Sequence, residues 1–248
     1  IEENSPMLTG LSDKIWEYAE LSMEESRSAA AHIAVLKAEG FTVEENLCGI
    51  PTAFTGTFGS LNKDSYSSVS INDHDEAYHA VKMLLDHGHR RVAILLESTK
   101  DRSISELRYR GYCDALRDAG IPLDPNLVAE SGSFEMEDVF VATKELLARC
   151  SDFTALFTIS DLMAMAAIKA LHSTGRQVPQ DCSVISIDGI EMTRFIVPTL
   201  TSLVQPAAEM GTQAVHILTD VLEGRGGHCH LSLETTLREG ETVAAPHL

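Results

Sequence analysis

Val92-Ala93-Ile94-Leu95-Leu96 is an unbroken apolar run that follows the polar stretch His87-Gly88-His89-Arg90-Arg91. A strand that is covered on both faces has this continuous pattern, whereas a strand with one face in water alternates. Ala155–Ile159 and Val184–Ile187 repeat the pattern further along the chain, and Leu127–Ala129 is a shorter candidate. These runs predict a parallel sheet that is buried on both faces.

Amphipathic helical patterns alternate with these strands, at Asp75–His87, Ser105–Ala119, Glu137–Ala148 and Asp161–His172. Strand and helix in alternation predict an α/β fold with a doubly wound parallel sheet. In such folds the ligand crevice lies beyond the carboxyl ends of the strands. We therefore expect functional side chains where the strands end.

The first 60 residues have a different pattern. Leu11–Ala19 has helical spacing, and Ser22 opens a capping box whose helix should end at Gly40. Phe41–Leu47 and Thr52–Phe58 then alternate as strands do, with a Gly-Ile-Pro turn between them. This stretch predicts a unit of two helices followed by two strands.

Charge and composition restrict the function. The chain of 248 residues carries 19 basic and 37 acidic side chains, a net charge of −18, which argues against nucleic-acid binding by this chain unaided. No apolar run is long enough for a transmembrane helix, and Ile1–Gly10 has neither a signal-peptide pattern nor a lipidated cysteine. Scattered cysteines favour reduced thiols, and we expect a cytoplasmic protein. Without a Gly-x-Gly-x-x-Gly or Walker pattern, no nucleotide cofactor is expected.

An ordered set of motifs lies in the second stretch: Asn72-Asp73, His87–Ile94, Arg108–Tyr112, Ser160–Ala164, Val178–Asp188, Pro198–Pro206 and Met210-Gly211. In this order and at these spacings, Ser67–Leu248 resembles the effector-binding domain of LacI-family transcriptional regulators. The resemblance implies a two-lobed fold like that of periplasmic binding proteins, with a small ligand between the lobes. Ligand-favoured lobe closure would then be transmitted to a DNA-binding headpiece. We expect a non-enzymatic sensor of a sugar or a purine, and a homodimer that contacts DNA only through a headpiece absent from this chain.

The resemblance also implies a set of ligand-binding residues: Asn72, Asp73, Arg102, Arg108, Phe134, Ser160, Asp161 and Asp188. An arginine fork facing a carboxylate suits ligands rich in hydroxyl or amide groups, because both offer directional hydrogen bonds. Simpler interpretations exist for several of them. Arg102 and Arg108 would be solvated arginines, Phe134 would anchor a loop, and Asp161 would only cap its helix.

The first stretch carries another resemblance, in Leu11–Leu21, Ser28–Ala30, Leu36–Phe41 and Gly49–Phe54. These segments resemble the opening of aminoacylase-type zinc amidohydrolases, near the aminobenzoyl-glutamate hydrolase group. The metal ligands of those enzymes would follow, but the pattern changes before they are reached. We therefore expect no metal site and no hydrolysis. A zinc amidohydrolase and a transport solute-binding protein remain the alternatives.

These patterns divide the chain into three segments. Residues 1–62 form the amidohydrolase-like segment, and residues 63–197 form the effector-binding lobe of carboxyl-terminal type. Residues 198–248 are expected to return to a second lobe, where they would pair with strands that this chain lacks. The second lobe is therefore expected to be incomplete or atypical, with exposed apolar faces that favour association.

Overall fold

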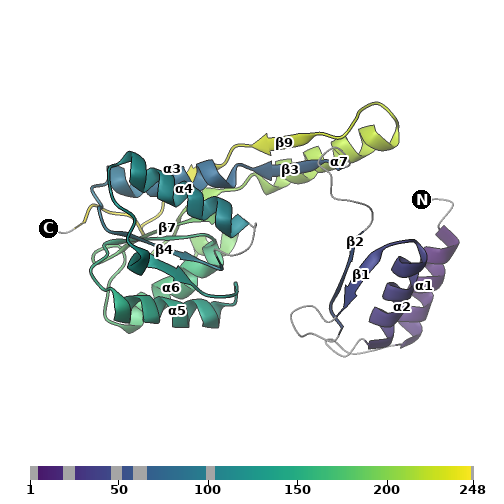
Figure 1. The fold of residues 1–248 in the computed structure, drawn as a ribbon, viewed down its shortest axis with the longest axis horizontal. Coiled ribbons are helices and arrows are strands. Elements are labelled where there is room, and N and C mark those ends of the chain that lie inside the picture. Colours follow the sequence, from purple (N-terminus) through teal and green to yellow (C-terminus); the bar gives the residue numbers. More distant parts are fainter. Residues whose placement is uncertain (1–4, 19–25, 46–51, 58–65, 99–103, 247–248) are drawn as a thin grey trace. The chain divides into compact units, whose positions relative to one another are not determined.

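A computed structural model describes residues 5–18, 26–45, 52–57, 66–98 and 104–246. The chain divides into two compact units, Ile1–Tyr66 and Ser67–Leu248. Figure 1 shows the elements of both. Each unit is described by itself.

The first unit contains two helices and an antiparallel hairpin. They are α1 (Ser5–Tyr18), α2 (Ser26–Ala38), β1 (Thr42–Glu45) and β2 (Phe54–Thr57). The predicted order of two helices and two strands is confirmed. On the hairpin, Thr42 lies opposite Thr57 and Glu45 opposite Phe54.

Gly40 ends α2, as the sequence predicts. Its φ of +87° is in the left-handed region that glycine adopts without a steric penalty. The backbone N–H of Phe41 donates to the carbonyl of Leu36 at 3.0 Å, which satisfies one of the last helical carbonyls. The predicted capping box at Ser22 and the turn Gly49–Pro51 lie outside the described residues.

The second unit is built on a six-stranded main sheet with the strand order β10-β8-β7-β6-β4-β5. Its strands are β4 (Val92–Leu96), β5 (Val128–Glu130), β6 (Ala155–Thr158), β7 (Ser183–Asp188), β8 (Thr201–Val204) and β10 (Thr236–Arg238). All neighbouring pairs are parallel except β10, which runs antiparallel to β8. The predicted parallel sheet is confirmed, with bounds close to those of the apolar runs.

Helices cover both faces of the main sheet (Figure 1). α3 (Asp73–Asp86) and α4 (Ile104–Asp118) lie on one face, and α5 (Met136–Arg149) and α6 (Asp161–Ser173) on the other. Two short 3-10 turns, η3 (Pro125–Leu127) and η4 (Glu191–Arg194), precede β5 and follow β7. This is the doubly wound α/β architecture that the alternation predicts.

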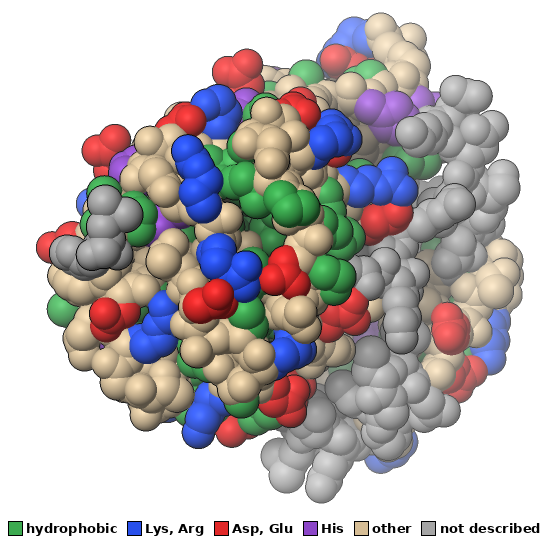
Figure 2. All heavy atoms as spheres, turned by 60° about the vertical axis from the view of Figure 1, so that its left-hand side comes forward, with side chains coloured by type: hydrophobic (Ala, Val, Ile, Leu, Met, Phe, Trp, Pro, Cys, Tyr) green, Lys and Arg blue, Asp and Glu red, His purple; other side chains and the backbone are tan. Residues whose placement is uncertain are grey.

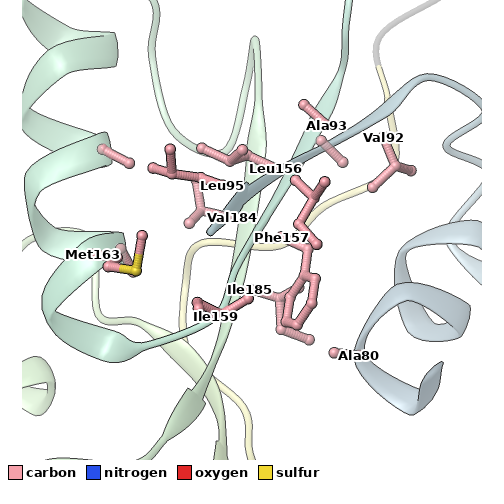
Figure 3. Packing of buried hydrophobic residues seen from close by; sticks show 14 of the residues in the cluster. Ala80, Val92, Ala93, Leu95, Leu156, Phe157, Ile159, Met163, Val184 and Ile185 are labelled. Atoms are coloured by element: carbon pink, nitrogen blue, oxygen red, sulfur yellow. The ribbon is translucent and has the colours of Figure 1, made fainter. Parts of the chain in front are cut away.

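The core lies on both sides of the central strands, as Figure 3 shows. Leu95 and Val184 point toward Met163 of α6, whereas Phe157 and Ile185 point toward Ala80 of α3. Every residue of β4 and β6 is buried, because a helix layer covers each face. A continuous apolar run is the sequence signature of that burial.

Three further elements form what we call the α7 arm: β3 (Ser68–Ile71), α7 (Ala207–Leu222) and β9 (His230–Leu233). β3 and β9 make a separate two-stranded parallel sheet, and α7 packs against β3. Within the described residues no side chain of α7 is buried, and Val215, Leu218 and Leu222 are each more than half exposed. The arm is therefore a small second layer and not a complete second lobe.

Residues 198–248 do not leave the main sheet as one segment, which differs from the predicted division. Thr201–Val204 pairs with β7, and Thr236–Arg238 pairs with β8. The physical reason is burial, since Leu200 and Leu203 belong to the main core. Of residues 198–248, only the part between β8 and β10, with α7 and β9, belongs to the α7 arm.

His89 fastens the end of the chain to the main sheet. Its Nε2 lies 2.9 Å from the carbonyl oxygen of Ala244, and its Nδ1 lies 2.8 Å from Oγ1 of Thr154. A carbonyl only accepts, so Nε2 carries the proton and Nδ1 accepts from the threonine hydroxyl. Burial lowers the pKa of His89 below its ordinary value of 6.5, against the opposing effect of the Ala244 carbonyl.

The contact between α3 and α4 yields a first prediction. A Cβ at Gly111 would lie 2.1 Å from the backbone oxygen of His74, so alanine there must push the two helices apart. We expect Gly111→Ala to lower the free energy of unfolding by about 1–3 kcal/mol in a urea titration. Gly211→Ala is the matched control, since nothing lies within 4 Å of that position, and it should leave stability equal or higher. Equal effects of the two changes would contradict the close approach.

His89 yields a pH prediction. The pKa of His89 is lower in the folded chain than in the unfolded chain, where it is about 6.5. The stability that neutral His89 contributes is therefore complete above pH 6.5 and is lost as the pH falls below that value. His89→Gln should therefore lower stability at pH 8 and make the loss between about pH 7 and 5 shallower than in the wild type. His216→Gln, exposed on α7, removes a histidine outside the network and is the control. Thermal unfolding across this range measures both, and parallel wild-type and His89→Gln curves would refute the assignment.

Candidate functional site

The carboxyl ends of β6, β7 and β8 lie along one edge of the main sheet, because these strands are parallel neighbours. Ser160 follows β6, Asp188 is the last residue of β7, and Gln205 follows β8 directly. Arg108 reaches the same edge from α4, where its Nη1 donates to the carbonyl oxygen of Ile159. Sequence-distant polar groups therefore meet where a doubly wound sheet places its ligand.

Arg108 is buried, with only 4% of its side chain exposed, so its interpretation as a solvated arginine is wrong. Its Nε and Nη2 lie 2.8 Å and 2.7 Å from Oδ1 of Asp73. Its Nη1 lies 3.7 Å from Oδ1 of Asp188. Within the described residues, Asp73 and Ile159 occupy three of the five N–H groups that an arginine carries. Asp73 thus acts on the site by orienting Arg108.

Asp188 is the carboxylate that stays accessible at this edge, with 26% of its side chain exposed. Oδ1 accepts from Nε2 of Gln205 at 2.8 Å, and Oδ2 accepts from the backbone N–H of Asp161 at 3.3 Å. Its φ of +134° is rare for a residue with a side chain. Burial raises the pKa of Asp188, although the nearby Arg108 guanidinium opposes that rise.

Asp161 has a different position, since its side chain is fully buried. Its carboxylate accepts from the Ser186 hydroxyl, from Ser202 Oγ at 2.6 Å, from Ile190 N at 2.9 Å and from Thr193 Oγ1 at 3.1 Å. These donors come from β7, β8 and the chain around η4. Asp161 therefore does more than cap α6: it joins the elements on which the site is built.

Ser160 and Asn72 are both N-cap residues. Ser160 Oγ accepts from the N–H of Met163 at 3.3 Å, which places the positive end of the α6 dipole at the site edge. Asn72 Oδ1 accepts from the N–H of Asp75 at 3.3 Å, and Asn72 also lines a cavity between α3 and β9. Its side chain serves the cap of α3, and within the described residues it makes no hydrogen bond to Arg108 or Asp188.

Two predicted residues remain, Phe134 and Arg102. Phe134 lies in the loop before α5 with 48% of its surface exposed, so it does not anchor that loop by burial. Arg102 lies outside the described residues. The structure therefore brings together Asp73, Arg108, Ser160, Asp161 and Asp188 from the predicted set, by the contacts described above.

Sequence reasoning missed Gln205, Ser202, Thr193 and Arg238. A signal existed for Gln205, because it follows an apolar strand in the way that Asp188 follows β7. The other three showed no such signal. Ser202 and Thr193 are buried in the structure, but nothing beside them in the sequence distinguishes them from polar residues on the surface. Within the described residues, no group of three or more His, Cys, Asp or Glu side chains could hold a metal ion. Among the described helices, none has the length and apolar character to cross a membrane.

The periplasmic binding protein-like domain family matches residues 81–243. This chain belongs to that family. The ribose operon repressor of Haemophilus influenzae is 37% identical over 161 residues, which are 65% of this chain and 47% of that protein. The transcriptional repressor PurR of Pasteurella multocida is 38% identical over 151 residues, 60% of this chain and 44% of that protein.

A solved structure shows the same fold: the transcriptional regulator CelR in complex with cellobiose, with a TM-score of 0.69 and 33% identity. The match covers 74% of this chain and 56% of that one. The chain thus spans about half the length of the curated relatives it matches. These matches confirm the resemblance to LacI-type effector-binding domains, and the relatives are regulators, not enzymes. They give no support to the aminoacylase resemblance of the first stretch.

The buried carboxylate yields a stability prediction. Asp161→Asn replaces an acceptor by an amide that cannot accept from all four donors, so we expect a loss of about 2–4 kcal/mol in the free energy of unfolding. The control is Asp220→Asn, because Asp220 is half exposed on α7 and its ion pair with Arg225 should contribute less than about 0.5 kcal/mol. Urea titration measures both variants. A loss at Asp161 no larger than that of the control would contradict its role.

Proposed function

We propose that residues 67–248 are the sensor domain of a LacI-type transcriptional regulator and bind a small, uncharged, hydroxyl-rich ligand. The observation that carries the proposal is the accessible Asp188 carboxylate beside the buried Arg108 guanidinium, 3.7 Å apart at the carboxyl ends of the strands. A carboxylate accepts hydrogen bonds from paired hydroxyls, and an arginine with spare N–H groups donates to a hydroxyl or carbonyl oxygen. The cellobiose complex of the similar regulator supports this ligand class.

The charge of the site supports a neutral ligand. Among the described residues, the carboxylates of Asp73, Asp161 and Asp188 face two guanidiniums, those of Arg108 and Arg238, so acidic groups outnumber basic groups by one. A phosphorylated sugar would bring further negative charge to this edge and would be repelled. We therefore propose a free sugar as the ligand, or a purine, whose ring offers the same directional groups.

We propose that the ligand acts by favouring one arrangement of the main sheet relative to the α7 arm, with a coupling of about 1–3 kcal/mol. Contact with DNA would be made by a headpiece outside these 248 residues, because the chain itself is strongly acidic. Figure 2 agrees with this, since the face that it shows has basic and acidic side chains interspersed. We place the regulator in the cytoplasm.

A homodimer is part of the proposal. Met192, Phe195 and Val197 follow the Asp188 turn and are 59%, 78% and 88% exposed. Large apolar side chains this accessible are unfavourable in water and are typical of a surface that another protein covers. A second copy of this chain is the proposed occupant, and sedimentation velocity tests it. A monomer at every concentration would overturn this part.

Thermal unfolding with added ligands tests the sensor function. The panel is D-ribose, cellobiose, hypoxanthine, ribose 5-phosphate and N-acetylglutamate, each with zinc and with EDTA. A ligand at about 100 times its Kd adds roughly 2.7 kcal/mol, which is several degrees for a unit of this size. We expect a shift from a neutral sugar or the purine, none from the phosphate, and no effect of EDTA.

Two variants localise the binding. Asp188→Asn should remove the shift at little cost in stability, because burial already disfavours the ionised carboxylate. Asp181→Asn is the control, since Asp181 precedes the same strand at its opposite end and should keep the shift. A shift that survives Asp188→Asn would overturn the site. A shift only from N-acetylglutamate with zinc would favour the amidohydrolase alternative.

A further inference from the structure

Arg238 lies beneath the turn that carries Asp188, at the end of the edge strand β10. Its Nη1 donates to the carbonyl oxygens of Gly189 and Ile190 at 3.1 Å and 3.3 Å, and its Nη2 donates to Thr193 Oγ1. Nη2 also lies 3.6 Å from Oδ2 of the buried Asp161. One planar guanidinium thus holds both carbonyls of the turn and the first residues of the chain that follows.

The turn itself is unfavourable without such support. Asp188 has a φ of +134°, a region that residues with a side chain rarely occupy and that persists only where the surrounding structure supports it. Gly189 follows with a φ of +76°, and a Cβ there would lie 2.6 Å from the Cα of Val204. The backbone of the turn therefore packs directly against β8. The hydrogen bonds around the turn hold it in this unusual conformation.

We propose that Arg238 is the positioning residue of the ligand site: by holding the Gly189 and Ile190 carbonyls it keeps the Asp188 carboxylate aimed at the edge where Arg108 lies. Within the described residues, the hydrogen bonds of Arg238 go to the Gly189 and Ile190 carbonyls and to Thr193, and none goes to Asp188 or Arg108. Its effect passes through the backbone of the turn. As a statement about ligand binding this rests on the proposed function, whereas the conformation of Asp188 can be tested without a ligand.

Arg238 lies where the chain passes from the α7 arm back into the main sheet. β10 is the strand by which the chain re-enters the main sheet from β9 of the α7 arm. Arg238 is paired with Ser202 of β8, and Ser202 Oγ accepts from the Gly189 N–H at 3.2 Å. A displacement of the arm that moves β10 would therefore reach the turn at Asp188 through the Arg238 side chain and through its strand partner Ser202.

The titration of Asp188 reports its position. Within the part of the chain that the structure describes, the charged groups around it are Arg108 from α4, Asp73 from α3, Asp161 from α6 and, through the turn, Arg238 from β10. Burial is the main cause of its raised pKa, so a relaxed turn that frees the carboxylate should lower the pKa toward the ordinary value. Simple loss of a nearby cation would raise the pKa instead. A fall in the pKa of Asp188 would therefore indicate a lost positioning role, and a rise would indicate only a lost positive charge.

The experiment uses the full chain with ¹³C-labelled aspartate and follows the Asp188 carboxyl signal by NMR as a function of pH, without ligand. Arg238→Lys keeps the positive charge near Asp161 but has no fork that can hold both carbonyls and Thr193. Arg238→Gln removes the charge as well. The matched control is Arg194→Gln, which removes an exposed arginine of η4 whose partner is Glu191.

We expect the pKa of Asp188 to fall in Arg238→Lys and to stay at its wild-type value in Arg194→Gln. If Arg238→Gln fails to fold, because Asp161 loses its cation, Arg238→Lys decides alone. An unchanged or raised pKa in a folded Arg238→Lys would overturn the proposal.

Affinity for D-ribose or cellobiose, where the wild type binds them, should fall about tenfold or more in Arg238→Lys. Unchanged affinity would likewise overturn the positioning role. If neither sugar binds the wild type and the pKa still falls in Arg238→Lys, the proposed ligand class fails while the role of Arg238 is supported. The two proposals can therefore fail separately.

Discussion

The carboxylate of Asp161, fully removed from solvent, is the constraint on which the site depends. Ionised carboxylates are costly to bury, and the cost is offset only where every lone pair is satisfied. Here two serine hydroxyls, a threonine hydroxyl and a backbone N–H supply the donors, and Arg238 supplies a cation 3.6 Å away. The donors come from β7, β8 and the chain around η4, so satisfying one carboxylate fixes the relative positions of these segments and the start of α6. The proposed ligand site, with Arg108 and Asp188, lies on the outer surface of that arrangement.

Two aspartates of the predicted set thereby acquire separate roles. Asp161 sits inside and holds the elements together, while Asp188 stands at the surface, supported from behind by Gln205 and by the N–H of Asp161. Their separation follows from position: a residue in the first turn of α6 faces the neighbouring strands, whereas the last residue of β7 lies where the sheet ends. Arg108 is held in a comparable way by Asp73, so both groups of the proposed ligand site, Arg108 and Asp188, have partners that orient them.

The sequence predicted most of the fold and part of the site. Continuous apolar runs and helical periodicity are local patterns, and they located the central strands and the helices around them within a few residues. The hydrogen-bond partners of Asp161 are 25 to 41 residues away along the chain, so nothing adjacent to it distinguishes a network centre from a simple helix cap. The role of Arg238 could not be predicted for the same reason, because its partners Gly189, Ile190 and Thr193 lie 45 to 49 residues away. The fate of residues 198–248 was also unpredictable, because β8 and β10 are too short to show periodicity and join the main sheet through distant partners.

Three passages of the chain connect the main sheet with the α7 arm, and all three pass through the proposed ligand site. β3 leads into α3 at Asp73, β8 leads toward α7 at Gln205, and β9 returns to the sheet through β10 at Arg238. Each passage carries a residue of the network: Asp73 holds Arg108, Gln205 holds Asp188, and Arg238 holds the turn after Asp188. A small two-stranded sheet with one exposed helix has little buried apolar surface, so we expect the arm to be the less stable part of this unit. Under the proposed function, a ligand bound by Arg108 and Asp188 would act on all three passages at once, and through them on the arm.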